Sequence, residues 1–530
     1  MENTSVERLK GIARTQREYF RSGATLEIDF RKRMLSRLME ALEAWQDRLS
    51  QALWDDLHKS PQEAYLMEFG IIKEEIKTHL KNLSKWAARK KVHSPVTVFP
   101  SKSYIIKEPL GCALIISPWN YPVQLLMNPL IGAISAGCTA VLKPSPYVPN
   151  VSEAIGKMVS ETFNEEYIAV VQGDREVNTA LLEERWDMIF FTGSPALGRT
   201  VMSAAAKNLT PVVLELGGKS PCIIDRTADV KAAAKRVVWG KTINSGQTCI
   251  APDYLIVHKD IKEAFIRAFA HAVFTLHGED IFNSDHYVHM VNQKSYNRVC
   301  SYLSQGNIIY GGRTNPAARC IEPTLLDDVP EDAPVMQEEI FGPIFPIITF
   351  TDSPAEKNPS AEKSATGPTT AHGTCETPDT SEAPDTCEAQ GISEAHGTCE
   401  APGISEAPGT CKAPGTCAAE SGTFAQQAVN YIVEREKPLA LYYFGDEKTG
   451  WEIMKKTSSG GGCINDVIMH IANGDLPFGG VGNSGMGRYH HKESFECFSH
   501  TRSILVSYTW PDLPFRYMPY RFFKWVKGLM

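Results

Sequence analysis

Short apolar runs alternate with helical patterns along most of this chain, and this alternation limits the folds open to it. The runs hold four to six residues each, with helix-like segments between them. Strands that are apolar on both faces belong to parallel sheets covered by helices on both sides. The pattern therefore predicts an α/β protein with doubly wound, Rossmann-like sheets. The runs of the first unit are CALIIS, TAVLKPS, IAVVQG, MIFFTGS and PVVLELGG.

A second alternation begins with SPCIID at residues 220–225 and continues to YLIVH at 254–258, so the chain holds two such units. Ahead of both, large apolar residues at helical spacing predict an amphipathic helix over residues 27–57. A second helical stretch is expected from Pro61 to Lys90, because proline suits the first turn of a helix. A chain of 530 residues has room for two or three domains.

Residues 354–423 interrupt this pattern with a repeated hexapeptide that resembles SEAPGT or TCEAPG. The tract has no aromatic residue, leucine or valine, so it cannot bury enough surface to offset chain entropy. We expect a disordered surface insertion. We give metal binding by its cysteines little weight, because ligands twelve residues apart are not preorganised. These cysteines are Cys375, Cys387, Cys399, Cys411 and Cys417.

Charge and cysteine usage exclude several classes of protein. The tract's 11 acidic and 3 basic residues account for the whole net charge of −8, so the remaining body is neutral and no nucleic-acid partner is expected. No apolar run reaches the length of about 18 residues that a transmembrane helix needs. Thirteen scattered cysteines without a C-x-x-C pair favour reduced thiols in a cytoplasm over a disulfide framework or a zinc site.

The C-terminal end, FRYMPYRFFKWVKGLM, is basic and aromatic. Such a segment could touch a membrane surface. We favour the alternative that it packs on the body of the chain or on a partner subunit.

Cys249 lies in NSGQTCIAPDY, between a polar turn and a short apolar run. A catalytic cysteine has to be partly exposed and able to form a thiolate, and Gly246 would allow a ligand to approach the backbone closely. The segment alone does not distinguish Cys249 from a small buried hydrophobe. That second interpretation is the one we give to Cys112, Cys138, Cys222, Cys463 and Cys497.

Two further polar residues stand where chemistry is possible. Glu215 lies between leucines at the end of an apolar run, where burial would raise the pKa of its carboxyl group and make it a general base near neutral pH. Asn120 lies in the turn after CALIIS, where an amide could stabilise an oxyanion. The alternative for Glu215 is that it merely caps the end of the strand. The alternative for Asn120 is that it stabilises the turn, where asparagine is common.

Two segments lie at strand ends, where open parallel sheets bind nucleotides. Lys143 ends the run in VLKPSP. FTGSPALG at 191–198 follows a strand and opens a helix, whose free N–H groups could meet a pyrophosphate. The spacing from Gly193 to Gly198 is not that of G-x-G-x-x-G, which by itself counts against a nucleotide site.

Taken together, the motifs resemble those of the aldehyde dehydrogenase superfamily, in the family's order and over residues 100–510 apart from the insertion. Two of them, TCIAPDY and YHHKESFECFSH, look most like the class 3 branch, which includes fatty and aromatic aldehyde dehydrogenases. The matching segments are PWNYP, KPS, FTGSPALG, ELGGKSP, GQTCIAPDY, QEEIFGP and PFGGVGNSGMGRYHHKESFECFSH.

The resemblance implies catalytic roles for three residues. Cys249 would attack the aldehyde to form a thiohemiacetal, and Asn120 with the backbone N–H of Cys249 would hold the oxyanion. After hydride leaves, a thioester remains, and Glu215 would activate the water that releases a carboxylic acid. The implied cofactor is NAD, held by Trp119, Lys143, Gly193, Ser194, Gly198, Glu339 and Phe341.

Pro146 stands where many family members have a glutamate that grips the adenosine 2′-hydroxyl. Without that carboxylate the 2′-phosphate of NADP is not repelled, so we expect NAD use with NADP tolerated. Class 3 relatives favour medium or long aliphatic and aromatic aldehydes, and we expect the same substrates and a homodimer. The dimer's shared sheet would use the segment near SYIIKEPLG and the strand RSILVSY at 502–508.

The resemblance also divides the chain. We expect a cofactor-binding domain at 1–98 and 109–214, bridging and oligomerisation strands at 99–108 and 497–510, a catalytic domain at 215–353 and 424–496, and a tail at 511–530. Two rival functions stay open. One is an acylating dehydrogenase that passes the thioester to coenzyme A, although such relatives generally lack the residue found here as Glu215. The other is an inactive scaffold that binds partners through its repeat tract.

Overall fold

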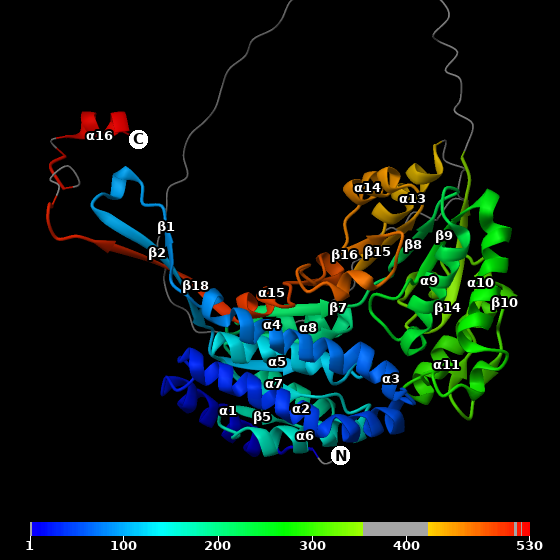
Figure 1. The fold of residues 1–530 in the computed structure, drawn as a ribbon, viewed down its shortest axis with the longest axis horizontal. Helices are drawn as coiled ribbons and strands as arrows, with labels where there is room; N and C mark the ends of the chain where they lie inside the picture. Colours follow the sequence, from blue (N-terminus) through cyan, green and yellow to red (C-terminus); the bar gives the residue numbers. More distant parts are fainter. Residues whose placement is uncertain (1–2, 353–421, 513–516, 521, 530) are drawn as a thin grey trace, which may run out of the picture. The chain divides into compact units, whose positions relative to one another are not determined.

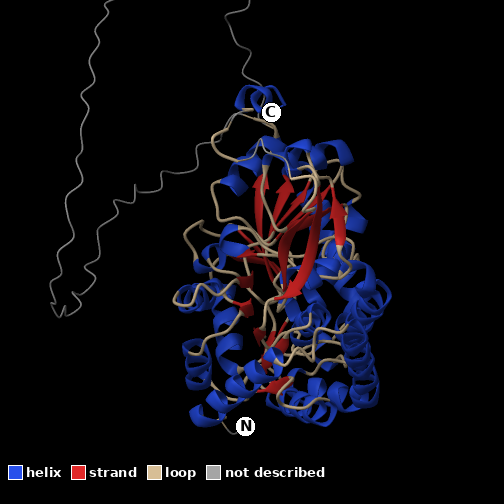
Figure 2. Cartoon of the chain, turned by 90° about the vertical axis from the view of Figure 1, so that its left-hand side faces the viewer, coloured by secondary structure: helices blue, strands red, loops and turns tan. Residues whose placement is uncertain are grey.

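The computed structural model describes residues 3–352, 422–512, 517–520 and 522–529 (Figure 1). The predicted insertion at 354–423 lies outside these residues, except for its last two positions. Two large sheets, with helices on the outside, form most of the described part of the chain (Figure 2). The prediction of an α/β fold with doubly wound sheets is confirmed.

The first large sheet has six strands in the order β17-β7-β6-β3-β4-β5. Neighbouring strands are parallel except β17, which pairs antiparallel with β7 at Gly485 and Glu215. Each of the five apolar runs of the first unit forms one parallel strand. The bounds are β3 (Cys112–Ile116), β4 (Thr139–Lys143), β5 (Ile168–Val170), β6 (Met188–Gly193), β7 (Val212–Leu216) and β17 (Gly485–Met486).

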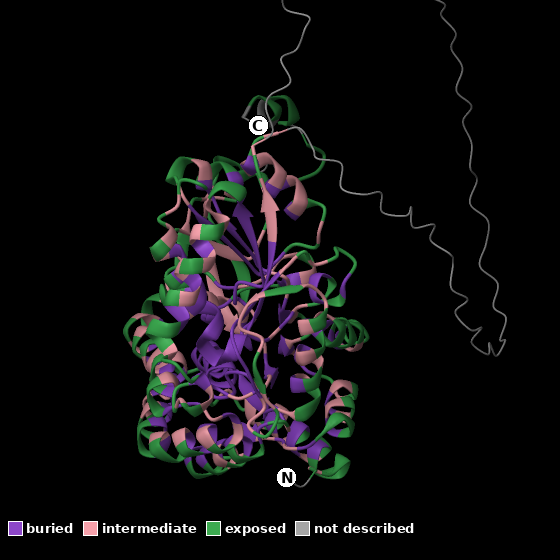
Figure 3. Cartoon of the chain, turned by 90° about the vertical axis from the view of Figure 1, so that its right-hand side faces the viewer, coloured by how far each residue is buried: buried purple, intermediate pink, exposed green. Residues whose placement is uncertain are grey.

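Alternate residues of these strands face two separate cores. In β3, Leu114 packs with helices α1, α7 and α8, whereas Ile115 packs with α2, α5 and α6. Burial on both faces explains why the strands are continuously apolar rather than alternating. Figure 3 shows the buried residues concentrated on the strands and on the helix faces toward them. The covering helices are α1 (Val6–Arg21), α2 (Ile28–Leu57), α5 (Gln124–Ala136), α6 (Pro149–Thr162), α7 (Arg175–Glu183) and α8 (Pro195–Ala206).

The second large sheet has seven strands in the order β10-β13-β14-β9-β8-β15-β16, and only β10 is antiparallel to its neighbour. Helices α9 and α10 cover one face, and α11, α13 and α14 cover the other. The strands are β8 (Pro221–Ile224), β9 (Tyr254–His258), β10 (Asn307–Tyr310), β13 (Thr324–Asp327), β14 (Ile344–Phe350), β15 (Ala440–Phe444) and β16 (Gly461–Ile464). The helices are α9 (Val230–Thr242), α10 (Lys262–His277), α11 (Gln293–Ser301), α12 (Pro334–Gln337), α13 (Phe424–Val433) and α14 (Glu447–Lys456).

A third, antiparallel sheet joins distant parts of the sequence in the order β1-β2-β18. Strands β2 and β18 pair along their whole length, with Ser101 opposite Ser507 at one end and Pro109 opposite Ser499 at the other. The two segments predicted to form a shared sheet are thus paired within one chain, and β18 forms the outer edge. The bounds are β1 (Lys90–Val92), β2 (Ser101–Pro109) and β18 (Ser499–Ser507), with a separate short pair β11 (Thr314–Asn315) and β12 (Cys320–Ile321).

Two details differ from the sequence-based expectations. The helical stretch from Pro61 ends at Trp86 rather than Lys90, and it contains a π-helical turn at Tyr65–Phe69 between α3 (Pro61–Ala64) and α4 (Gly70–Trp86). Lys90 instead starts β1, because its backbone pairs with Ile105. Strand β7 runs through the expected domain boundary after residue 214 to Leu216, and the division into domains stays a prediction.

Among the described residues of the C-terminal tail, several large side chains are exposed. Tyr517, Met518 and Phe523 are exposed along it, before and within α16 (Phe523–Leu529). Packing on the body of the chain or on a partner subunit stays a prediction. No helix among the described residues combines the length and apolar character that crossing a membrane requires.

Candidate active site

One cavity of about 260 Å³ gathers most of the residues that the sequence singled out. It opens where β6 and β7 end and where the turns after β3 and α9 meet them. Its lining is largely apolar, with two carboxylates, one thiol, one amide, one guanidinium group and two hydroxyl groups. The lining residues are Pro118, Trp119, Asn120, Leu125, Thr192, Gly193, Ser194, Glu215, Leu216, Gly217, Cys249, Arg298, Glu339, Phe341 and Phe478.

Cys249 reaches this cavity from a strained turn between α9 and β9. Asn244 and Ser245 both have a φ of 50°, and Gly246 follows with a φ of 74°. A side chain at Gly246 would meet the carbonyl oxygen of Gly342 at 2.5 Å. Glycine is therefore needed there for the close approach of another backbone segment, rather than of a ligand as the sequence suggested.

Burial raises the pKa of the Cys249 thiol, and the nearby carboxylates Glu215 and Glu339 raise it further. In the protein alone, Cys249 therefore carries its proton at neutral pH. Positive charge that enters the cavity would lower the pKa of this thiol. The cysteines that we interpreted as structural lie elsewhere: Cys112, Cys138 and Cys222 are buried, and Cys463 and Cys497 are half-buried.

Asn120 lies in the loop between β3 and α5, with its side chain buried. Its Nδ2 donates a hydrogen bond to the carbonyl oxygen of Gln247 at 3.0 Å. An amide nitrogen carries two hydrogens, so one remains for a ligand in the cavity. The bond holds the amide of Asn120 against the backbone two residues before Cys249.

Glu215 projects from β7 and is 2% exposed. Neither of its carboxylate oxygens has a hydrogen-bond partner of normal geometry among the described residues. Burial raises its pKa well above the ordinary value, and the backbone N–H of Gly480 offsets only part of that effect. An unpartnered buried carboxyl group on a cavity wall is available to take a proton from a small molecule.

Glu339 enters the cavity from the loop after α12, and several contacts fix that loop. Asp253 accepts a hydrogen bond from the backbone N–H of Ile340 at 2.9 Å and forms an ion pair with Lys219. A side chain at Gly217 would meet the Glu339 carboxylate at 2.0 Å, so only glycine leaves room for it. Burial and the charge of Asp253 raise the pKa of Glu339 to about 8.

Two aromatic residues and an arginine complete the wall around Glu339. The rings of Trp119 and Phe341 meet edge to face with centroids 5.4 Å apart. Arg298 donates to the carbonyl oxygens of Glu339 at 3.2 Å and Ile340 at 2.9 Å. Sequence reasoning missed Arg298, because a single arginine on helix α11 carries no local signal of this role.

The residues of FTGSPALG divide between the cavity and the packing behind it. Gly193 and Ser194 line the cavity, and the Ser194 hydroxyl caps α8 by accepting from the N–H of Leu197 at 3.4 Å. Gly198 lies behind them, where a side chain would meet Leu216 at 2.7 Å. Because Gly198 has no side chain, α8 can pack closely on β7.

Lys143 is not among the lining residues. It ends β4, is 1% exposed, and donates to the carbonyl oxygen of Pro144 at 2.8 Å. Burial lowers the pKa of its ammonium group to about 8.

The features around Glu339 fit the predicted dinucleotide. Glu339 Oε1 is buried without a hydrogen-bond partner among the described residues and could accept from a ribose hydroxyl. The N-terminus of α8 beside Gly193 and Ser194 suits a pyrophosphate. Within the same described residues, no group of three or more His, Cys, Asp or Glu side chains is placed to bind a metal.

Comparison with known proteins gives a consistent result. A model of the aldehyde dehydrogenase family matches residues 1–364. The chain is 40% identical over 514 residues to 4,4′-diaponeurosporen-aldehyde dehydrogenase of Staphylococcus aureus, with 96% of each protein covered. It is 35% identical over 500 residues to the dimeric NADP-preferring aldehyde dehydrogenase of Canis lupus familiaris, with 94% of each covered. The solved structure of substrate-bound Staphylococcus aureus AldH superposes with a TM-score of 0.83 at 38% identity, covering 98% of this chain and 99% of that one.

Proposed function

The chain belongs to the aldehyde dehydrogenase family, and we propose that Cys249 is the nucleophile with which it oxidises aldehydes. The overall reaction consumes an aldehyde, NAD(P)⁺ and water, and yields a carboxylic acid, NAD(P)H and a proton. The observation that carries the proposal is that Cys249, Asn120 and Glu215 line one cavity together with Glu339.

In the first chemical step the Cys249 thiol releases its proton, which is the proton that the overall reaction yields, and its sulfur joins the aldehyde carbon and places a negative charge on the carbonyl oxygen. The free Nδ2 hydrogen of Asn120 donates to this oxygen, and the backbone N–H of Cys249 supplies a second donor. Preorganised donors of this kind stabilise a developing oxyanion more effectively than water does. A nicotinamide cofactor held by Glu339 and Phe341 would supply the acceptor for the hydride that this carbon loses, and the acyl group would then remain on Cys249 as a thioester.

The second step hydrolyses the thioester. Glu215 removes a proton from a water molecule, and that water attacks the thioester carbon, so that the acid leaves and the thiol of Cys249 returns. The raised pKa of Glu215 suits this role, because a stronger base takes the proton more readily. The same residue favours hydrolysis over transfer of the acyl group to coenzyme A.

A direct assay tests the whole proposal. We expect an aldehyde-dependent rise in the absorbance of reduced cofactor, with acid released in the absence of coenzyme A. Cys249→Ala should lower the rate by about a thousandfold or more, because no other group replaces the thiol. Full activity in Cys249→Ala would overturn the assignment, and a strict need for coenzyme A would favour the acylating alternative.

For the cofactor, we propose NAD with NADP tolerated. Pro146 lies in the turn between β4 and α6, where it offers no carboxylate to repel a 2′-phosphate, and the canine relative is described as NADP-preferring. Comparing kcat/KM for the two cofactors tests this. A preference for NAD above about a thousandfold, roughly 4 kcal/mol, would contradict it.

For the substrate, we propose medium or long aliphatic and aromatic aldehydes. The apolar side chains of Trp119, Leu125, Phe341 and Phe478 on the cavity wall support this class. Each methylene that is accommodated should contribute about 1–3 kcal/mol to discrimination, so a panel of aldehydes of graded length locates the optimum. A kcat/KM that falls steadily from the shortest aldehyde onward would refute the proposal.

We also propose a homodimer that uses the outer edge of β18. Leu505 and Val506 are exposed on this strand, and the backbone of an edge strand can pair with a second copy. The canine relative is described as dimeric. Sedimentation analysis should give twice the mass of one chain, and a monomer at micromolar concentration would overturn this proposal.

A further inference from the structure

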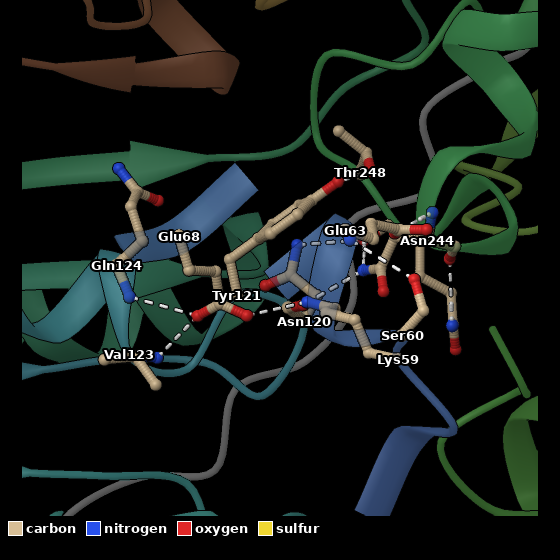
Figure 4. A network of polar contacts seen from close by, with 11 residues as sticks. Lys59, Ser60, Glu63, Glu68, Asn120, Tyr121, Val123, Gln124, Asn244 and Thr248 are labelled. Atoms are coloured by element: carbon tan, nitrogen blue, oxygen red, sulfur yellow. Dashed lines mark hydrogen bonds and ion pairs between the residues drawn. The ribbon is translucent and has the colours of Figure 1, made fainter. Parts of the chain in front are cut away.

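Lys59, two residues before α3, has a fully buried ammonium group that faces the loop of Asn120 (Figure 4). Its Nζ pairs with Glu68 Oε1 at 2.7 Å and donates to the carbonyl oxygen of Asn120 at 3.0 Å. It also lies 4.4 Å from the ring centroid of Tyr121. The cation therefore contacts two consecutive residues of the β3–α5 loop.

Glu68 fixes the other end of the same loop. Its Oε2 accepts from the backbone N–H groups of Val123 at 2.8 Å and Gln124 at 3.1 Å (Figure 4). These N–H groups begin helix α5, whose first residues have no side-chain cap of their own. Both oxygens of Glu68 are thus engaged, one by Lys59 and one by the helix start.

The loop of Asn120 is joined in turn to the turn that carries Cys249. Asn244 Nδ2 donates at 3.0 Å to the carbonyl oxygens of both Asn120 and Gln247, while Asn120 Nδ2 donates to that same Gln247 oxygen. The strained backbone of Asn244 is itself held, because its N–H donates to Glu63 Oε1 at 2.9 Å.

A second connection runs through Tyr121. Its hydroxyl group is 2.7 Å from Oγ1 of Thr248, the residue before Cys249. The ring of Tyr121 lies against Lys59, so the ammonium group acts on both connections between the two loops.

From these contacts we infer that Lys59 and Glu68 are positioning residues, which hold the oxyanion donor Asn120 in register with Cys249. The inference rests on the proposed function of the same cavity. A fully buried ion pair is a poor source of net stability, because desolvation of both charges offsets their attraction. Its geometric effect is larger, because a displacement of about 1 Å at a reacting group can slow a reaction by about a hundredfold.

The test uses single turnovers of the full-length chain, with enzyme in excess over aldehyde and saturating NAD. The rate at which reduced cofactor forms then measures the steps up to the thioester, even if a later step limits steady-state turnover. In Lys59→Met/Glu68→Gln, which removes both charges, we expect this rate to fall at least about tenfold. Lys59→Met alone should melt at a lower temperature than the double variant, because it leaves the Glu68 charge buried without a partner.

Two comparisons separate positioning from general loosening of the fold. In an Asn120→Ala background the double substitution should change the single-turnover rate by less than about twofold, because the donor through which it acts is already gone. Alkylation of Cys249 by iodoacetamide needs no oxyanion donor, so its rate should match that of the wild type. Peptide mass spectrometry identifies the alkylated cysteine.

A matched control is the pair Lys262 and Asp327, which are 2.6 Å apart and do not line the cavity. Lys262→Met/Asp327→Asn should leave the single-turnover rate unchanged. Each of three outcomes would overturn the inference. The first is an unchanged single-turnover rate in Lys59→Met/Glu68→Gln, and the second is an equal fall of that rate in the Asn120→Ala background. The third is a parallel fall in the rate of Cys249 alkylation. A wild-type chain that forms no reduced cofactor with any aldehyde of the panel would instead overturn the proposed function, and this inference with it.

Discussion

At the scale of single residues, the two carboxyl groups of the cavity differ in how they are held. Glu339 sits opposite Gly217 and near the ion pair of Lys219 and Asp253, whereas Glu215 has only the backbone near Gly480. Burial raises both pKa values, while the backbone N–H of Gly218 and the charges of Lys219 and Lys241 limit the pKa of Glu339 to about 8. Glu215, which has fewer contacts, is the group proposed to exchange a proton. Glu339, which is more tightly packed, is the group proposed to hold the cofactor.

Replacing Glu215 by Gln should separate the two chemical steps. The amide cannot take a proton from water, so the steady-state rate should fall by about a hundredfold or more while the single-turnover rate stays within about twofold. Intact-mass measurement should detect the acyl group that remains on Cys249. A steady-state rate equal to that of the wild type would exclude Glu215 as the base.

The same residue predicts a pH dependence. Because the pKa of Glu215 is raised, its ionised form appears only well above the usual carboxyl range. Thioester hydrolysis should therefore accelerate as pH rises through that pKa, and this limb of the profile should be absent in Glu215→Gln. An identical profile in both proteins would contradict the prediction.

Gly217→Ala should act on cofactor binding. A methyl group there would meet the Glu339 carboxylate at 2.0 Å and displace it. We expect KM for NAD to rise about tenfold, roughly 1.4 kcal/mol, with alkylation of Cys249 unchanged. The control is Gly11→Ala in helix α1, where a methyl group meets nothing within 4 Å. An unchanged KM in Gly217→Ala would argue against the role of Glu339.

At the scale of elements, α4 is tied to the C-terminal segment that leads into α15 (Lys492–Cys497). Glu75 of α4 is 3% exposed and accepts from the backbone N–H of His491 at 2.7 Å and the hydroxyl of Ser494 at 2.8 Å. Burial alone would raise the pKa of Glu75, but the hydrogen bond and charge of His79 and two further histidines lower it to about 2.

This depressed pKa predicts how stability depends on pH. The ionised carboxylate of Glu75 therefore stabilises the fold above pH 4.5, its unfolded value, and that stabilisation is lost as pH falls toward 2. Below pH 4.5 the free energy of unfolding should fall by about 1.4 kcal/mol per pH unit more in the wild type than in Glu75→Gln.

Denaturant titrations between pH 7 and pH 3.5 measure this difference. The control is Glu74→Gln, which alters an exposed neighbour on the same helix and should follow the wild type. Parallel curves for the wild type and Glu75→Gln would show that the buried carboxylate is not linked to folding.

The π-helical turn at Tyr65–Phe69 is an element that the sequence did not indicate. Apolar periodicity correctly predicts the helices on either side of it, because their buried stripes face a core. A π-helical turn shifts the face that later residues present, and such turns occur frequently at functional sites. Here the turn contains Glu68, whose carboxylate points away from solvent toward Lys59.

At the scale of the whole molecule, the two ends that flank the repeat tract lie side by side in the described chain. The backbone N–H of Phe424 donates to Asp352 Oδ1 at 2.9 Å, and Gln427 Nε2 donates to the carbonyl oxygen of Thr351 at 2.7 Å. A short connection can therefore replace the intervening residues.

Deleting residues 353–422 and joining Asp352 to Thr423 through two glycines should leave kcat/KM unchanged. The shorter connection lowers the entropy of the unfolded chain, so the unfolding temperature should not fall. Enzyme assay and thermal unfolding of the two chains measure these outcomes. Failure to fold, or loss of activity in a folded protein, would show that the tract has a structural or catalytic part.

Sequence alone determined the fold class, because strands buried on both faces must be continuously apolar and their helices must repeat at 3.6 residues. The motif set also pointed to Cys249, Asn120 and Glu215. Only the tertiary structure decided that one cavity unites them, that Gly246 makes room for the backbone of Gly342, and that Lys59 and Glu68 reach the loop of Asn120. Local sequence records which faces are apolar, whereas contacts between residues 61 to 181 positions apart depend on how the elements pack.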